Sequence, residues 1–127
     1  MTTEEAKNKI FRIIISCELS LYTALYTPDK AVVPISTIID FIEGLTKYRA
    51  RLALKELINE NLLYYTSQGC PALLSPSTES HYAELIDDSR PPINGYALTK
   101  KAFKSQQWKD AYSSWHKSME DWANDNI

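Results

Sequence analysis

Glycine and cysteine are scarce in this chain of 127 residues, which has three glycines and two cysteines. The glycines stand at positions 44, 69 and 95, too far apart to build a glycine-rich phosphate-binding loop. Cys17 and Cys70 are also distant and form no CxxC pair. Two reduced thiols are therefore the simplest interpretation, although a disulfide between them stays open.

The chain also lacks an excess of positive charge, because its formal net charge is −2. Bulk basicity therefore gives no reason to expect nucleic-acid binding, and only a local cluster of cations could support it. No apolar run is long enough to cross a bilayer; the densest, residues 10–15, is interrupted by Arg12. The polar start, MTTEEAKNK, does not have the pattern of a secretory signal. We therefore expect one cytoplasmic domain spanning residues 1–127, with no membrane partner.

Side chains that could form an active site are few and scattered. His81 and His116 have no spacing that pairs either with a nucleophile or a second metal ligand. The carboxylates at 84, 87 and 88 lack the pattern of a calcium loop. We therefore expect no enzyme, no metal site and no cofactor.

The first predicted element is a long helix over residues 4–26 within an N-terminal segment, 1–27. Thr3 is a suitable N-cap, and Glu4 and Glu5 complement the helix dipole. Apolar residues occupy most of its circumference, so more than one neighbouring element must cover it. Pro28 cannot continue the helix.

Two further helices are predicted on either side of a tight turn. The first covers about 36–43 after Pro34. Gly44 is suited to the left-handed conformation of the residue that ends this helix. Thr46 is a good N-cap for the second, over residues 46–60. Apolar residues of that second helix recur at i, i+3, i+4, i+7 and i+8, which predicts a buried face. These residues are Ala50, Ala53, Leu54, Leu57 and Ile58.

The remaining elements are two strands and a C-terminal helix. Residues 62–67 and 93–98 have strand composition, and segment 68–92 between them is too long for a structureless loop. Whether "PALL" or "HYAELID" adds structure there stays open. The last helix is predicted from Thr99 to about Asn124. Its apolar residues follow the 4, 3, 4, 3 spacing of a helix–helix seam, namely Trp108, Tyr112, Trp115, Met119 and Trp122.

Two stretches resemble winged-helix transcriptional regulators of the MarR-like and PadR-like type. "PISTIIDFIEGLTKYRARLALKELINENLLYY" resembles their helix-turn-helix core, with Gly44-Leu45-Thr46 as the turn and Asn61 in place of a glycine usual in those families. "NGYALTKKAF" matches their Gly-Tyr-x-Leu-Thr return strand. The resemblance implies a mainly α fold with a small β-hairpin: a winged helix over residues 34–98, between the N-terminal helix and a C-terminal segment, 99–127.

The resemblance also implies that the helix over residues 46–60 reads the major groove of double-stranded DNA to regulate transcription. Cations at the start of a helix oppose its own dipole, so a cluster there needs an external anion or another role. The candidate DNA-binding residues are Thr46, Lys47, Tyr48, Arg49, Arg51 and Lys55.

Each of these interpretations has a simpler rival. A ridge of lysine and arginine on a helix is most often a solvated face, and the segment 68–92 is acidic for a DNA-gripping wing. The protein could instead be a winged-helix module for protein–protein contact that does not bind DNA. The tryptophan seam either covers the first helix or joins two protomers, and we expect the homodimer. A small-molecule effector pocket in the seam has no polar anchor that we can identify.

Overall fold

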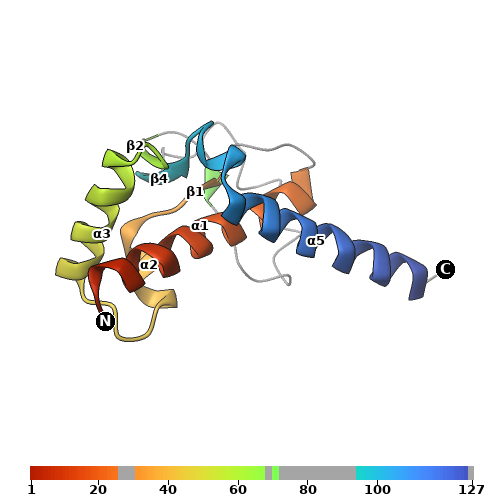
Figure 1. Ribbon diagram of the computed structural model, residues 1–127, viewed down its shortest axis with the longest axis horizontal. Coiled ribbons are helices and arrows are strands. Elements are labelled where there is room, and N and C mark those ends of the chain that lie inside the picture. The colour runs from red at the N-terminus through yellow and green to blue at the C-terminus, as the bar shows by residue number, and fades with distance from the viewer. Residues whose placement is uncertain (26–30, 68–69, 72–93, 126–127) are drawn as a thin grey trace.

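The computed structural model describes residues 1–25, 31–67, 70–71 and 94–125, with side chains in 1–20, 31–67 and 94–125. The described part is mainly helical with a small two-stranded antiparallel sheet, as the sequence predicts. Its elements, labelled as in Figure 1, are α1 (Thr3–Leu25), β1 (Ala31–Val32), α2 (Ile35–Phe41), α3 (Lys47–Asn59), β2 (Leu63–Thr66), β3 (Cys70–Pro71), β4 (Gly95–Leu98), the 3-10 helix η2 (Ala102–Lys104) and α5 (Gln106–Asp125).

Helix α1 starts from a cap one residue earlier than the sequence suggested. The Thr2 hydroxyl accepts a hydrogen bond from the Glu5 amide at 3.1 Å, and the Thr2 carbonyl accepts one from Ala6. The predicted cap at Thr3 is therefore wrong. The Thr3 hydroxyl instead contacts a residue of α3. The apolar surface of α1 is covered as expected: Ile10, Ile14 and Cys17 are fully buried.

The junction from α2 to α3 forms as its residues predict. Pro34 precedes the first turn of α2, and Ile42 ends it. Gly44 has a φ of +81°, the left-handed conformation for which glycine was predicted. Thr46 caps α3, since its hydroxyl accepts the Arg49 amide at 3.1 Å.

Helix α3 packs on α1 through the small and apolar face read from the sequence, with one exception. Ala50, Ala53, Leu54 and Leu57 are buried. Ile58, predicted to be buried, is 39% exposed, so this assignment was wrong. The chain then turns at Asn61, whose φ of 60° brings Leu62 back toward Leu57.

Strands β2 and β4 form the antiparallel pair, in the register Leu63 to Leu98 and Thr66 to Gly95. The chain just after β1 joins this sheet, because Val33 and Tyr96 exchange two backbone hydrogen bonds of 2.9 Å. A side chain on Gly95 would lie 2.6 Å from the backbone of Val33, so only glycine permits this approach. The alternatives for "PALL" and "HYAELID" fall almost entirely outside the described residues; β3, at the edge of "PALL", pairs in parallel with β1.

Thr99 joins the end of β4 to the end of α3. Its hydroxyl donates to the Asn61 carbonyl at 2.6 Å and accepts the Ala102 amide at 3.2 Å. Lys101 adds a hydrogen bond to the Glu60 carbonyl at 2.8 Å. The threonine of the "GYALT" stretch therefore holds the sheet and the following helix onto the last turn of α3.

The C-terminal helix is interrupted, contrary to the single helix predicted from Thr99. After η2, Ser105 starts a new helix: its hydroxyl accepts the Trp108 amide at 3.2 Å, and its carbonyl accepts Lys109. Phe103 packs edge-on against Trp108 across this cap, with ring centroids 4.7 Å apart. Ser105, a residue type that can cap a helix, stands three residues before Trp108, and this spacing was the sequence signal for the break.

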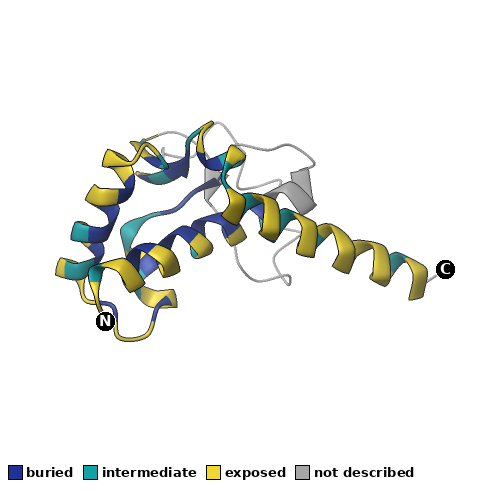
Figure 2. Ribbon diagram, in the orientation of Figure 1, coloured by how far each residue is buried: buried dark blue, intermediate teal, exposed yellow. Residues whose placement is uncertain are grey.

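Helix α5 crosses α1 and then extends past the rest of the structure (Figure 1). Figure 2 shows that most of its length is exposed, and none of its residues is buried. No described helix is apolar enough over a sufficient length to span a membrane.

We expect Gly95→Ala to lower the free energy of unfolding by about 1–3 kcal/mol, because its methyl group must push apart the Val33 and Tyr96 strands. Chemical denaturation measures this loss. Gly44→Asn is the control: position 44 has open space, and asparagine tolerates a positive φ. Equal losses from both variants would contradict the close-approach argument.

Candidate nucleic-acid interface

The first two turns of α3 present a cationic and aromatic surface to solvent. Its exposed residues are Thr46, Lys47, Tyr48, Arg51 and Lys55, and Tyr48, at 70%, is the most exposed large apolar residue in the described part of the chain. Lys47, Arg51 and Lys55 are spaced by four, so they form one ridge on the exposed surface of α3, away from the buried alanines. Neither α5 nor the β2–β4 sheet covers this ridge.

The ridge is not neutralised within the described residues. Lys47, Arg51 and Lys55 form no ion pair there. The acidic residues later on α3, Glu56 and Glu60, are directed instead toward Lys7 of α1. The carboxylates of Glu56 and Glu60 are therefore paired within the chain, whereas the cations of the ridge remain available to a partner.

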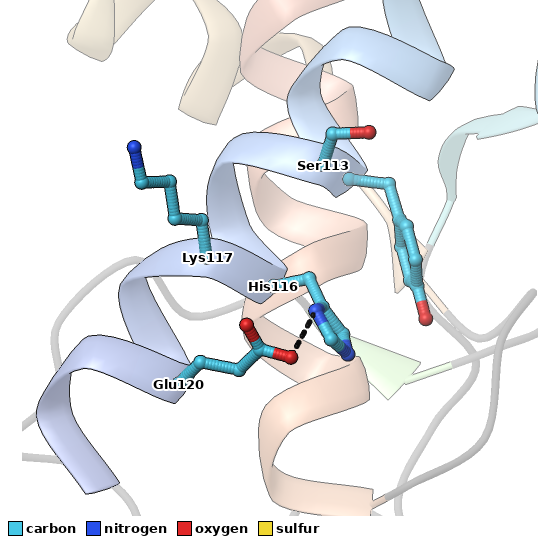
Figure 3. Close-up of a pocket in the computed structure, with 5 residues that line it drawn as sticks. Ser113, His116, Lys117 and Glu120 are labelled. Atoms are coloured by element: carbon cyan, nitrogen blue, oxygen red, sulfur yellow. Dashed lines mark ion pairs between the residues drawn. The ribbon is translucent and has the colours of Figure 1, made fainter. Parts of the chain in front are cut away.

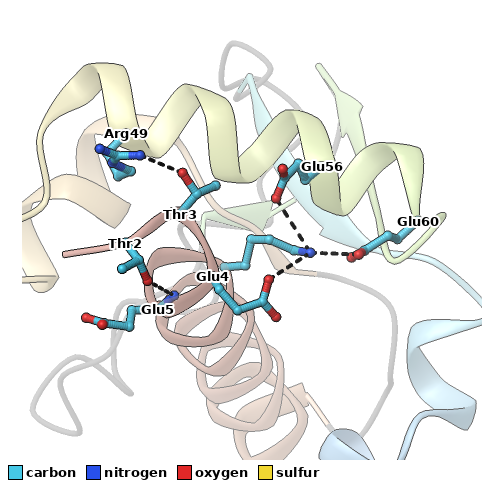
Figure 4. Close-up of polar contacts among 8 residues, drawn as sticks. Thr2, Thr3, Glu4, Glu5, Arg49, Glu56 and Glu60 are labelled. Carbon is cyan, nitrogen blue, oxygen red and sulfur yellow. Dashed lines mark hydrogen bonds and ion pairs between the residues drawn. The ribbon is translucent and has the colours of Figure 1, made fainter.

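Arg49 differs from the other candidate residues. It is only partly exposed, and its guanidinium donates to the Thr3 hydroxyl at 2.6 Å (Figure 4). Its position places it at the contact between the starts of α1 and α3. Sequence spacing alone groups Arg49 with its neighbours, but the structure gives it a role in holding two helices together.

Lys7 forms a second contact between α1 and α3. Its ammonium lies 2.6 Å from Glu60, 3.5 Å from Glu4 and 3.6 Å from Glu56, with its side chain only 10% exposed (Figure 4). The hydrogen bond to Glu60 and the attraction of all three carboxylates raise the pKa of Lys7 above its ordinary value, although burial opposes the rise. Arg49 at the start of α3 and this cluster at its end fix the orientation of the helix on α1.

Two tyrosines that sequence reasoning did not select lie close to the ridge. Tyr65 of β2, 58% exposed, and Tyr96 of β4 are cross-strand partners with rings at 5.3 Å. Burial and the neighbouring Tyr65 raise the pKa of Tyr96, while the charge of Arg51 opposes that rise. Arg51 is therefore within electrostatic reach of Tyr96 in the β2–β4 sheet.

The five predicted seam residues divide into two groups. Trp108, Tyr112 and Trp115 are partly buried and pack against the core. Met119 and Trp122 are 40% and 63% exposed. The inner half of the seam thus covers α1 within the same chain, and the outer half remains largely open to solvent.

Helix α5 also carries a shallow polar hollow around His116. His116 Nδ1 lies 3.3 Å from Glu120, and Ser113 and Lys117 line the same surface (Figure 3). The described side chains that line this hollow all come from α5. No group of three potential metal ligands occurs among the residues that the structure describes.

Cys17 is a buried free thiol. Burial, with the adjacent Glu18 carboxylate adding to it, raises the pKa of the Cys17 thiol to about 12. The thiol therefore stays protonated at neutral pH and acts as an apolar core group. The side chain of Cys70 lies outside the described residues.

Comparison with protein-family models, with curated proteins and with solved structures found no match for this chain.

We expect Lys7→Met, which keeps the apolar stem but removes the ammonium, to cost about 1–2 kcal/mol, since a hydrogen bond to a charged group is lost and its carboxylates are half exposed. Lys9→Met, at an exposed position of α1, is the control and should be nearly neutral.

The pH dependence follows from the raised pKa of Lys7. The stabilising contribution is complete below the ordinary lysine value of 10.5 and disappears as pH rises through the higher folded-state value. The difference in unfolding free energy between wild type and Lys7→Met should thus be constant from neutral pH to about 10 and shrink above it. A difference that is unchanged in strong alkali would rule out the ionic origin.

Proposed function

We propose that the protein is a winged-helix transcriptional regulator that binds double-stranded DNA in a sequence-specific manner, with α3 in the major groove. The observation that carries the proposal is the exposed ridge of Lys47, Arg51 and Lys55, which forms no ion pair among the described residues and lies on a helix whose acidic residues pair with Lys7 of α1. Cations placed in this way complement the phosphates on either side of a groove.

The arrangement around α3 supports the winged-helix interpretation. Helix α2, a glycine turn and α3 follow one another, and the antiparallel pair β2–β4 follows α3 directly. The third strand position, at Val33, lies against β4. This order and pairing agree with a helix-turn-helix followed by a wing, whose segment 72–93 lies outside the described residues.

The residues of the ridge are suited to different contacts. Arg51 can make two parallel hydrogen bonds to a guanine edge or to a phosphate, whereas Lys47 and Lys55 act as point charges. Tyr48, at the exposed start of α3, offers both an apolar ring and a hydroxyl. Arg49 is assigned to positioning α3, because its guanidinium is engaged with Thr3.

A second candidate function is a winged-helix module for protein–protein contact without DNA binding. The exposed Met119 and Trp122 and the net charge of −2 favour it. In that case α5 rather than α3 would be the functional surface.

We expect the purified protein to bind duplex DNA at low salt, with an affinity that falls steeply as salt is added because counterions are released. Arg51→Ala and Lys47→Ala should each weaken binding and lower the salt slope by about one, without changing the melting temperature. Fluorescence anisotropy with a labelled duplex measures both quantities.

Lys117→Ala is the matched control, because it removes the same charge from an exposed position on α5. Arg49→Ala should additionally cost about 0.5–1.5 kcal/mol of stability through loss of the Thr3 hydrogen bond. Absence of duplex binding by the wild type at low salt, or equal effects of Lys117→Ala and Arg51→Ala, would argue for the protein-interaction module.

A further inference from the structure

We infer that a groove along α1, bounded by the end of α2 and by the first half of α5, binds a short acidic peptide segment of a partner protein. Both α2 and α5 contact α1 (Figure 1). The inference does not rest on DNA binding, because no residue of the ridge on α3 lines this groove.

The groove consists of two hollows that share part of their lining. The first, of about 290 Å³, lies between α1 and the end of α2, and the second, of about 390 Å³, lies between α1 and the first half of α5. Arg12 and Ser16 line both hollows, so the two adjoin along α1. Adjoining hollows of this kind suit an extended peptide, whose successive side chains can enter one after the other.

Each hollow has an apolar part that can hold a side chain of the peptide. Phe41, the last residue of α2, is 54% exposed and lines the first hollow together with Ile13 and Ile42. Ile15 and Ala111 supply the apolar part of the second. An exposed aromatic ring beside aliphatic side chains is typical of surfaces that receive the apolar anchor of a partner. The groove therefore offers two apolar sites, one in each hollow.

Two cations of α1 select a peptide with negative charge. Lys9 and Arg12 are exposed, line the first hollow and stand three positions apart, so they lie on one face of the helix. Neither forms an ion pair with a described residue, whereas Lys7 of the same helix is within reach of three carboxylates. A peptide carboxylate at this point can accept two parallel hydrogen bonds from the Arg12 guanidinium and is also attracted by Lys9.

The acidic residues of the groove favour a peptide over a nucleic acid. Glu43 lines the first hollow, and Asp110 lines the second. A phosphate backbone that crossed both hollows would carry negative charge past both carboxylates, which repel it. A peptide can instead place its acidic side chain at Arg12, between the hollows, and an apolar side chain in each of them. The ligand that fits is therefore an acidic residue flanked by apolar ones.

A displayed library of random short peptides tests the class of ligand. Peptides that the wild type retains and that Arg12→Glu does not retain should be enriched in sequences with an acidic residue between apolar ones. The charge reversal lies at an exposed position, and circular dichroism checks that the variant remains folded. The inference is overturned when no peptide is enriched, or when the enriched peptides lack acidic residues.

The most enriched peptide, synthesised with a fluorescein label, then locates the site by anisotropy. Arg12→Glu and Phe41→Ser should each raise its Kd by about tenfold or more, because the first removes the carboxylate's partner and the second an apolar wall. The matched controls are Lys117→Glu on α5 and Tyr48→Ser on α3, which make the same kinds of change at exposed positions outside both hollows. Controls that weaken binding as much as the groove variants would overturn the inference.

Competition experiments exclude the other occupants of the groove. Neither duplex DNA nor vesicles of phosphatidylglycerol should displace the labelled peptide, and displacement by either would assign Lys9 and Arg12 to a phosphate-binding surface instead. Light scattering should show the same number of chains per particle with and without peptide, whereas a peptide that dissociates an oligomer would assign the groove to a second copy. Arg12→Glu should leave duplex binding by the ridge unchanged, so the peptide site and the proposed DNA binding can fail independently.

Discussion

The apolar circumference of α1 is the constraint on which the rest of this structure depends. A helix with Ile10, Ile14 and Cys17 on its surface cannot remain in water, so α3, the strands and α5 must each cover a part of it. The small residues Ala50 and Ala53 let α3 approach closely. Because the small and apolar face of α3 packs against α1, its lysines and Arg51 face solvent. The candidate interface is thus a consequence of how the core is covered.

Polar contacts then set the angle of α3 without taking part in the candidate interface. Lys7 gathers Glu56 and Glu60 at one end of α3, and Arg49 reaches Thr3 at the other. As a result, the acidic residues of α3 pair with Lys7 of α1, whereas Lys47, Arg51 and Lys55 form no ion pair among the described residues. A chain with a net charge of −2 can in this way present a locally positive surface, which composition alone would not suggest.

The predictions that succeeded concern residues whose conformation is decided within a few positions. Thr46 caps α3, and Gly44 and Asn61 take the left-handed conformation, because the conformation of each depends on neighbouring backbone groups. The predictions that failed depended on partners far along the chain or on a competing local cap. Ile58 has helical spacing suited to burial, but the described elements leave it 39% exposed. Ser105 interrupts the C-terminal helix because its hydroxyl caps Trp108.

By itself the sequence determined the presence of α1, α2 and α3, the cap of α3 at Thr46 and the turn at Gly44, since hydrogen bonds and periodicity over a few residues are enough to specify these. It also determined that cations gather at the start of α3 and that an apolar seam runs along α5. Only the tertiary structure decided which of those side chains are used internally: Arg49 on Thr3, the acids of α3 on Lys7, and the inner tryptophans on the core. The physical reason is that burial and ion pairing depend on segments brought together from distant positions, as Gly95 and Val33 are. The periodicity of a sequence does not specify those neighbours.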